Sequence, residues 1–210
     1  MNVSQYNEGF DSTATHNGKE WDPKFAPSYT PEEMLKLGVF EGKYINNIKG
    51  VPASWKSLPK VVGPKDPPDP TLNKYGVKSR QGLSVWKENG WIKTDKNGWF
   101  EWYIHYFLGR RLDKEDDWQI GRWNSFVARH QGQINNDPKS KDGDHRLVQK
   151  QALLQWAWDW ETAFTEEQRK KNAMRISKLA GASLSESATK DNKKIAQESL
   201  LIVPKYMQWN

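Results

Sequence analysis

Residues 98–111 read GWFEWYIHYFLGRR, an almost unbroken run of aromatic and aliphatic side chains between two glycines, followed by two arginines. Ten residues rich in β-favouring side chains, Trp99 to Leu108, are also compatible with a buried strand. Because no partner strand is evident elsewhere in the chain, the run favours a helix that ends at Gly109. The sequence therefore predicts a compact, mainly α (all-α) domain, with at most a minor pair of strands.

The chain that follows this run continues in helical patterns. Over 113–134, acidic residues suit the positive N-terminal end of a helix, and apolar positions then recur at helical spacing. Asp144 is placed to cap a long helix that reaches Trp160. A short helix over 84–89 is expected to stop at Gly90, and capping residues begin two more helices, over 165–181 and 183–203.

The N-terminal third is long, irregular and rich in proline. Residues 1–29 are polar and aperiodic, which predicts an extended arm that is ordered only if its aromatic residues, such as Trp21 and Phe25, dock. At 30–33, Thr-Pro-Glu-Glu forms a capping box, which predicts a short helix over 31–37 that Gly38 ends.

Six prolines between 50 and 74 exclude a regular helix there and favour an extended, fairly stiff segment. Within it, 65–70 is the clearest linker in the chain and marks the main boundary. We expect four parts: an arm, a short helix with a proline-rich segment packed on the core, a core rich in Trp and Arg, and a basic helical extension, over 1–29, 30–82, 83–163 and 164–210.

Twelve tryptophans occur in 210 residues, nine of them between Trp86 and Trp160, which means an aromatic core, an aromatic binding surface, or both. Only 36% of the residues are apolar, no apolar run could cross a membrane, and no secretory signal begins the chain. Zero cysteines exclude disulfides and thiolate chemistry, and make the cytoplasm the default compartment. No cofactor or metal site is predicted, and the motifs of P-loop, Rossmann, zincin and hydrolase proteins are absent.

The net charge of +6 favours an anionic partner, although the charge is unevenly distributed. Residues 81–163 hold 12 basic and 12 acidic groups, whereas 164–210 hold 9 and 5. The neutral centre nevertheless contains five of the eight arginines, whose guanidinium groups stack on indoles and fork onto phosphates. The lysine-rich C-terminal end offers a second phosphate-facing surface.

The segment 109–133 carries the strongest pattern for binding. Arg122 and Arg129 are seven residues apart and share a helical face, and Trp118 is placed to form a cation–π pair with Arg122. Together these residues predict a cationic cleft walled by indoles; alternatively, the arginines pair with nearby acids and the tryptophans form core. The candidate nucleic-acid contacts are Arg110, Arg111, Trp118, Arg122, Trp123, Arg129, Gln133 and Arg146.

A second pattern, KDGDHR at 141–146, resembles an acid–base or metal-binding loop, because two carboxylates lie beside an imidazole. A glycine turn followed by a helix cap explains the same residues equally well. His105 lies in an apolar run and is expected to be a core residue. The candidate catalytic residues are His130, Asp142, Asp144 and His145.

Five segments carry a resemblance to a known family: YTPEEMLKLGVFEGKY (29–44), LSVWKENGWI (83–92), GWFEWYIHYFLGRR (98–111), QIGRWNSFVARHQGQI (119–134) and QALLQWAWD (151–159). They resemble an uncharacterised family of Trp-rich helical proteins found in viruses of microbes and in some fungi and algae. The resemblance implies one domain that includes 29–44, leaves 160–210 as a lineage-specific extension, and implies no activity.

These observations predict a nucleic-acid-binding protein, with DNA as the expected partner, or a DNA-acting enzyme that modifies or excises a base in an Arg/Trp-lined cleft. The alternative is a non-enzymatic viral protein that binds a host protein through an aromatic surface. A third interpretation is a structural component of a larger assembly. No membrane partner is expected, and a viral protein would work in the host cytoplasm.

Overall fold

The computed structural model describes residues 21–79, 85, 88, 90 and 95–181. In these ranges the prediction of an all-α fold is confirmed, since every regular element is a helix or a 3₁₀ turn and no strand occurs. Most of the helix expected near 84–89, and the one expected over 183–203, lie outside them. The elements in chain order are α2 (Pro31–Leu37), η1 (Phe40–Gly42), η2 (Ile45–Asn47), α3 (Ala53–Lys56), η3 (Pro70–Leu72), α5 (Trp99–Phe107), α6 (Asp113–Asn135), η4 (Pro138–Lys141) and α7 (Leu147–Gln155), followed by a helix over 166–181.

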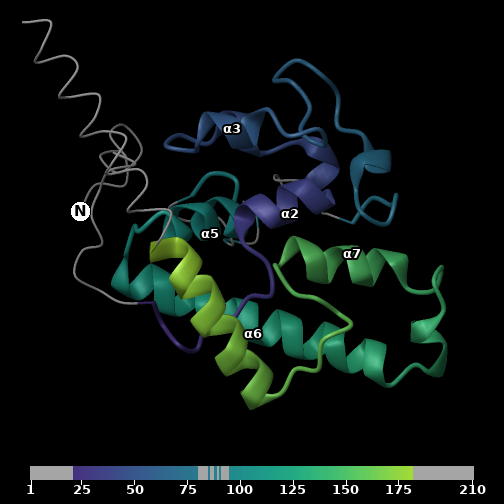
Figure 1. Ribbon diagram of the computed structural model, residues 1–210. Coiled ribbons are helices and arrows are strands. Elements are labelled where there is room, and N and C mark those ends of the chain that lie inside the picture. Colours follow the sequence, from purple (N-terminus) through teal and green to yellow (C-terminus); the bar gives the residue numbers. More distant parts are fainter. Residues whose placement is uncertain (1–20, 80–84, 86–87, 89, 91–94, 182–210) are drawn as a thin grey trace, which may run out of the picture.

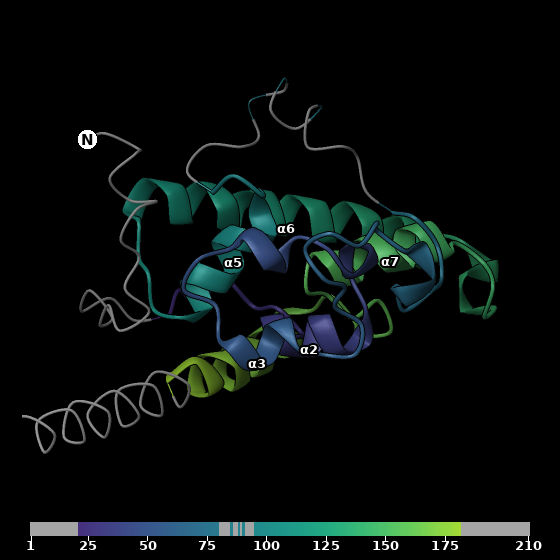
Figure 2. The same cartoon turned by 90° about the horizontal axis from the view of Figure 1, so that it is seen from above.

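The helices form three layers, with α5 and α7 between α6 on one side and α2 with α3 on the other (Figures 1 and 2). Helix α5 packs along the first half of α6, and α7 packs along the second half. Contacts between Gln133 and Gln149 and between Trp123 and Trp156 show that α6 and α7 are antiparallel.

The aromatic run after Gly98 is helix α5, and all nine of its residues are buried. It begins after a turn in which Gly98, at a positive φ of 75°, donates its N–H to Asp95 O over 2.9 Å. A helix satisfies its own backbone groups, so it can be buried on every side without a partner strand. The aromatic composition of the run therefore reflects burial rather than β structure.

Part of the predicted N-terminal arm belongs to this core. Phe25 is fully buried and meets Tyr103 and Trp123 edge-on, with ring centroids 5.1 and 5.3 Å apart. Trp21 stacks on Phe25, and its indole N–H donates to the Phe25 carbonyl. The arm was expected to be ordered only where its aromatic residues pack on the core. Trp21 and Phe25 do so, and residues 21–29 are accordingly part of the folded domain.

Helix α2 begins and ends where the sequence predicts. The Thr30 hydroxyl accepts the N–H of Glu33 over 3.1 Å, and the Glu33 carboxylate accepts the N–H of Thr30 over 2.8 Å. Gly38 ends the helix at a φ of 102°, where a Cβ atom would lie 2.0 Å from the Leu72 carbonyl oxygen. The glycine is thus required both by the backbone conformation and by close contact with the proline-rich segment.

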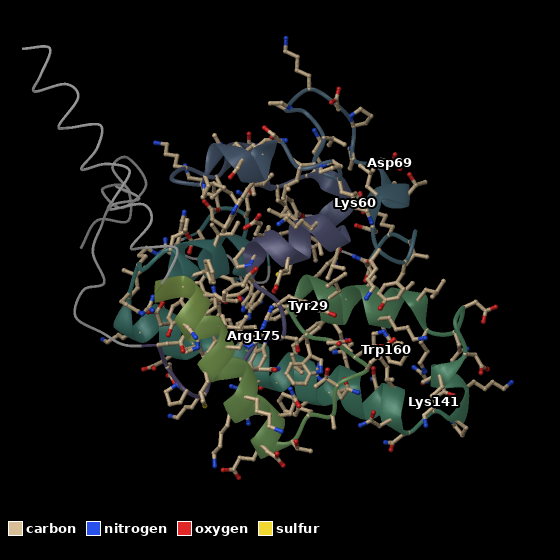
Figure 3. All side chains as sticks on the ribbon, viewed as in Figure 1. Tyr29, Lys60, Asp69, Lys141, Trp160 and Arg175 are labelled. Carbon is tan, nitrogen blue, oxygen red and sulfur yellow. The ribbon has the colours of Figure 1, made fainter. Side chains whose placement is uncertain are left out.

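The prediction that the prolines exclude a regular helix was wrong at one place, because α3 forms a single turn directly after Pro52. Proline is tolerated there since its missing N–H would have no partner in the first turn of a helix. The segment folds back on residues 38–42 through backbone bonds from Val62, Asp69 and Lys74. Figure 3 shows Lys60 and Asp69 beside α2; the Lys60 ammonium donates to the Leu37 carbonyl.

Helix α7 differs from its prediction at both ends. Asp144 does not cap it: the N-cap is Arg146, in the left-handed conformation and without a side-chain cap. The helix stops at Gln155 rather than reaching Trp160, and Ala157 has a φ of 56°. This reversal lets the Ala157 carbonyl accept the N–H groups of Ser28 and Tyr29, so a distant contact overrides the helical pattern.

The helix over 166–181 crosses in front of α5 and α6 in Figure 1 and buries Ile176 and Ala180. Arg175, labelled in Figure 3, forms an ion pair with Glu33 of α2 and donates to the Ser28 carbonyl over 3.1 Å. The expected capping contact from the Thr165 hydroxyl to the Gln168 N–H is present at 3.3 Å. Gly181, expected to end this helix, is itself helical. Among the described helices, none is long and apolar enough to cross a membrane.

Candidate functional site

A groove with a volume of about 1030 Å³ lies along one face of α6. Helix α7 and residues 78–79 form the rest of its lining. The α6 residues that line it are Asp117, Trp118, Gly121, Arg122, Ser125, Phe126, Arg129 and His130, and the others are Phe40, Lys78, Ser79, Val148, Ala152, Gln155 and Trp156.

The spacing of the α6 residues explains why they share this face. Trp118, Arg122, Ser125 and Arg129 recur at intervals of three and four, so they form one stripe along the helix. Gly121 lies beside this stripe, and a Cβ atom added to it would meet nothing within 4 Å. The small, exposed residues at 121 and 125 leave this part of the groove open between larger side chains.

Four stacked rings connect this groove to the core. Phe126 stacks on His130 at 3.9 Å and 19°, and on Trp156 at 4.4 Å and 11°. Trp156 stacks in turn on the buried Trp99 at 4.9 Å and 24°. Because Trp99 belongs to α5 and Phe126 to α6, the aromatic wall of the groove is held by two packed helices.

Arg122 lies against two indoles of the groove. Its guanidinium carbon is 4.7 Å from the ring centroid of Trp118 and 5.5 Å from that of Trp156, and it donates to Gln119 Oε1 over 3.1 Å. Burial lowers the pKa of Arg122, and the carboxylate of Glu115 partly opposes that shift. Since the ordinary pKa of an arginine lies far above neutrality, Arg122 stays charged at neutral pH.

His130 lies at the end of the stacked rings, nearest the C-terminal half of α6. Its Nδ1 is 2.9 Å from the Phe126 carbonyl oxygen, which can only accept, so Nδ1 carries the proton. In the neutral ring Nε2 is then an acceptor, and no described residue hydrogen-bonds to it. His130 can therefore accept a proton from a molecule in the groove.

The opposite wall is held by the polar side chain of Gln155. Its Oε1 accepts the N–H of Phe40 over 3.2 Å, and its Nε2 donates to the Ser79 carbonyl. The Ser79 hydroxyl donates to the Val148 carbonyl over 2.6 Å. These bonds hold residues 78–79 against α7, so Lys78 lines the groove. No local sequence pattern around Lys78 predicts that position.

The charges around the groove are mainly positive. Among the described residues that line it, Lys78, Arg122 and Arg129 are basic and one, Asp117, is a carboxylate. Lys78 and Arg129 are exposed, and neither forms an ion pair with a described residue. The groove thus combines stacked rings with cations at its rim.

Of the eight predicted nucleic-acid contacts, the structure brings Trp118, Arg122 and Arg129 together here, with His130 from the predicted catalytic set. Trp123 lies elsewhere: it is fully buried, and its indole N–H donates to the Trp156 carbonyl over 2.8 Å. The groove also gains Trp156, which follows directly after the last residue of α7.

Arg110 and Arg111 lie in the interior rather than in the groove. Arg110 forks onto the carboxylate of Asp95 and contacts His105 Nδ1 at 2.8 Å. The guanidinium of Arg111 lies 3.8 Å from the Tyr106 ring centroid and donates to the Tyr106 carbonyl over 2.6 Å. Both cations hold the turn between α5 and α6.

Asp95, Glu101 and His105 place potential metal-ligand atoms within 4.8 Å of one another, all of them buried. Burial alone would raise the pKa of Asp95, but hydrogen bonds from Arg110 and His105 hold it below its ordinary value. Burial raises the pKa of Glu101. A guanidinium therefore already supplies the cation of this cluster, and the expectation that His105 is a core residue is confirmed.

The remaining candidates gather at the far end of α6, around Asp137. The His145 Nε2 atom lies 2.8 Å from Asp137 Oδ2, and Arg146 Nε donates to the same oxygen. These two partners, the His145 bond first, hold the pKa of Asp137 well below its usual range. Asp144 is exposed, and the Asp142 carbonyl accepts the Lys150 ammonium over 2.9 Å.

Gln133, at this same end of α6, accepts the side-chain amide of Gln149 over 2.8 Å. It is exposed and does not line the groove. Gln133, predicted as a nucleic-acid contact, therefore serves the contact between α6 and α7.

No protein-family profile, curated protein or solved structure matches the chain. The resemblance to viral, fungal and algal proteins rests on the quoted residues alone.

Proposed function

We propose that this protein binds nucleic acid, with DNA as the expected ligand, through the groove along α6. The observation that carries the proposal is the convergence of Trp118, Arg122 and Arg129 with the stacked rings of Phe126 and Trp156 in one concavity. Cationic grooves lined by aromatic rings hold phosphate backbones while bases stack on the rings. The groove offers both kinds of contact.

The distribution of paired charges supports this groove over the basic C-terminal helix. In the described part of that helix, Lys170 and Lys171 lie 2.7 and 2.8 Å from Glu166 and Glu167. A lysine beside a carboxylate attracts a phosphate less strongly than an arginine or lysine that has no ion pair with a described residue, as is the case for Arg129 and Lys78. The groove is therefore the better anion site among the described residues.

A base-modifying or base-excising activity is the finer form of the proposal, and His130 favours it. His130 lines the groove at the end of the ring stack, and its Nε2 has no hydrogen-bond partner among the described residues. A base drawn out of a duplex and stacked there would have a proton acceptor beside it. His145 belongs to the Asp137 cluster and supports this role less well.

The alternative, a viral protein that binds a host protein through an aromatic surface, has less support. The exposed large apolar residues in the described ranges are Val85, Val148, Met174 and Leu179, and none of them is aromatic. The partly exposed rings on which a protein hot spot would rely, Trp118 and Trp156, lie in the groove, where the positive charge suits a phosphate better than an apolar protein surface. A cysteine-free chain suits a reducing compartment, so the proposal retains the cytoplasm, that of the host if the protein is viral.

Fluorescence anisotropy with a labelled DNA oligonucleotide across a salt series tests the proposal. Log affinity should fall linearly with log salt, and Arg129→Gln should reduce the slope by about 1. Lys141→Gln is the matched control: it removes the same charge from an exposed side chain outside the groove (Figure 3). No binding at low salt, or an equal effect of both variants, would remove the proposal.

A further inference from the structure

We infer that the groove takes single-stranded nucleic acid in preference to a duplex, with a base against the ring stack and phosphates at Arg129 and Lys78. The inference rests on the proposed function and specifies the form of its ligand. Three features of the groove carry it: its concavity, the different exposure of its rings and cations, and its length.

The first feature is that the binding face of α6 is recessed. A helix that reads duplex DNA must protrude far enough to enter a major groove about 12 Å wide. Here the face that carries Arg122 and Ser125 lines a concave groove together with α7 and residues 78–79. A flexible strand can follow such a groove, whereas a rigid double helix fits a concave face of this width less well.

The second feature is the difference in exposure between the aromatic rings and two of the cations. Trp118, Phe126 and Trp156 are partly buried, while Lys78 and Arg129 are exposed. A strand would thus place its bases inward on the rings and its phosphates outward on the cations. Only an unpaired base can offer its face to a ring, because bases in a duplex stack on one another.

The third feature is the length of the groove. At a rise of 1.5 Å per residue, the lining from Trp118 to His130 extends about 18 Å along α6, and Arg122 lies about 10 Å from Arg129. A volume of about 1030 Å³ is at the upper end for small-ligand sites, which run from about 300 to 1,000 Å³. The groove therefore suits a short segment of strand better than one nucleotide.

Two glycines of α6 provide a matched pair of variants. A Cβ atom meets nothing within 4 Å at Gly121 or at Gly132, but only Gly121 lines the groove. Leucine is a better helix former than glycine, so Gly121→Leu and Gly132→Leu should both fold. Gly121→Leu places a side chain where the strand would lie.

The experiment measures the affinities of both variants and the unmodified protein for a labelled 20-nucleotide DNA strand, the RNA of the same sequence, the hairpin duplex and a deoxynucleoside monophosphate. The unmodified protein should bind the strand at least about tenfold more tightly than the duplex or the monophosphate. One stacked base more than the duplex or the monophosphate can offer supplies about that factor. Gly121→Leu should lose about tenfold for the strand, and Gly132→Leu should stay within about twofold. The ratio of DNA to RNA affinity identifies which single strand the groove prefers.

The outcomes separate the two proposals. If no probe binds, nucleic-acid binding itself fails. If the duplex or the monophosphate binds as tightly as the strand, or if Gly132→Leu weakens binding as much as Gly121→Leu, single-strand recognition in the groove is overturned while nucleic-acid binding stands. Ser125 is a second exposed residue that lines the groove, and Ser125→Leu must reproduce the Gly121→Leu effect. The inference therefore stays testable if the glycine variant does not fold.

Discussion

The guanidinium of Arg122 lies over the indole of Trp118, with 4.7 Å between the guanidinium carbon and the ring centroid. The two residues are four apart on α6, the spacing from which the sequence predicts their pairing. A second indole, that of Trp156, arrives from beyond α7 and lies 5.5 Å from the same cation. The local pair thus becomes part of a groove wall only through tertiary packing.

The Trp118–Arg122 pair should be measurable in a double-mutant cycle. Trp118→Ala and Arg122→Ala together should show a coupling free energy of about 0.5–1 kcal/mol, the range for partly exposed cation–π pairs. Urea unfolding of the four proteins measures it. The exposed Lys36–Glu32 pair of α2, 2.7 Å apart, provides a reference cycle, in which we expect about 0.3–0.5 kcal/mol. Additive effects at positions 118 and 122 would contradict a stabilising contact.

The Asp137 cluster should make stability depend on acid pH. Because His145 and Arg146 hold the pKa of Asp137 below its unfolded value, the carboxylate stabilises the fold above that unfolded value, about 3.9, and the contribution is lost as the pH falls below it. Asp137→Asn should therefore be less stable at neutral pH but lose less free energy of unfolding between pH 5 and pH 2. Urea unfolding across this range measures the difference. Parallel pH profiles for the two proteins would show that the cluster contributes nothing.

Two glycines of the N-terminal third should respond very differently to alanine. At Gly38, with a φ of 102°, the new Cβ atom would lie 2.0 Å from the Leu72 carbonyl oxygen; at Gly76, with a φ of 65°, it would meet nothing within 4 Å. Gly76→Ala should cost about 1–2 kcal/mol, from the left-handed backbone alone. Gly38→Ala should cost more than about 4 kcal/mol, since backbone must also move. Thermal or urea unfolding ranks the two, and equal costs would mean that the proline-rich segment does not pack closely on α2.

Elements specified by local chemistry were predictable from the sequence. The capping box at Thr30 predicts α2 to the residue, and acidic residues followed by helical periodicity predict the start of α6 at Asp113 and its end within one residue. These signals work because each depends on side chains within a turn or two of the backbone they affect. The burial of α5 on all sides follows equally from its composition.

Features that depend on distant contacts were not predictable. Helix α7 ends at Gln155 because the Ala157 carbonyl is bonded to Ser28 and Tyr29, more than 100 residues earlier. Trp156 enters the groove for the same reason, and Lys78 does so because Gln155 holds Ser79. No sequence pattern within either segment predicts these long-range contacts. Periodicity indicates which face of a helix is apolar, but not which distant residues pack against that face.

The arginines of the predicted cleft divide into interior and groove residues, and mutation should separate them. Arg110→Met removes one partner of a buried ion pair with Asp95 and should cost about 3–5 kcal/mol of stability. Arg129→Met changes an exposed side chain and should stay within about 0.5 kcal/mol, while weakening nucleic-acid binding. Urea unfolding and anisotropy on both variants make the comparison. Sequence alone treats these arginines as equivalent members of one basic cluster, so a stable Arg110→Met protein with impaired binding would restore Arg110 to the binding surface and contradict its structural role.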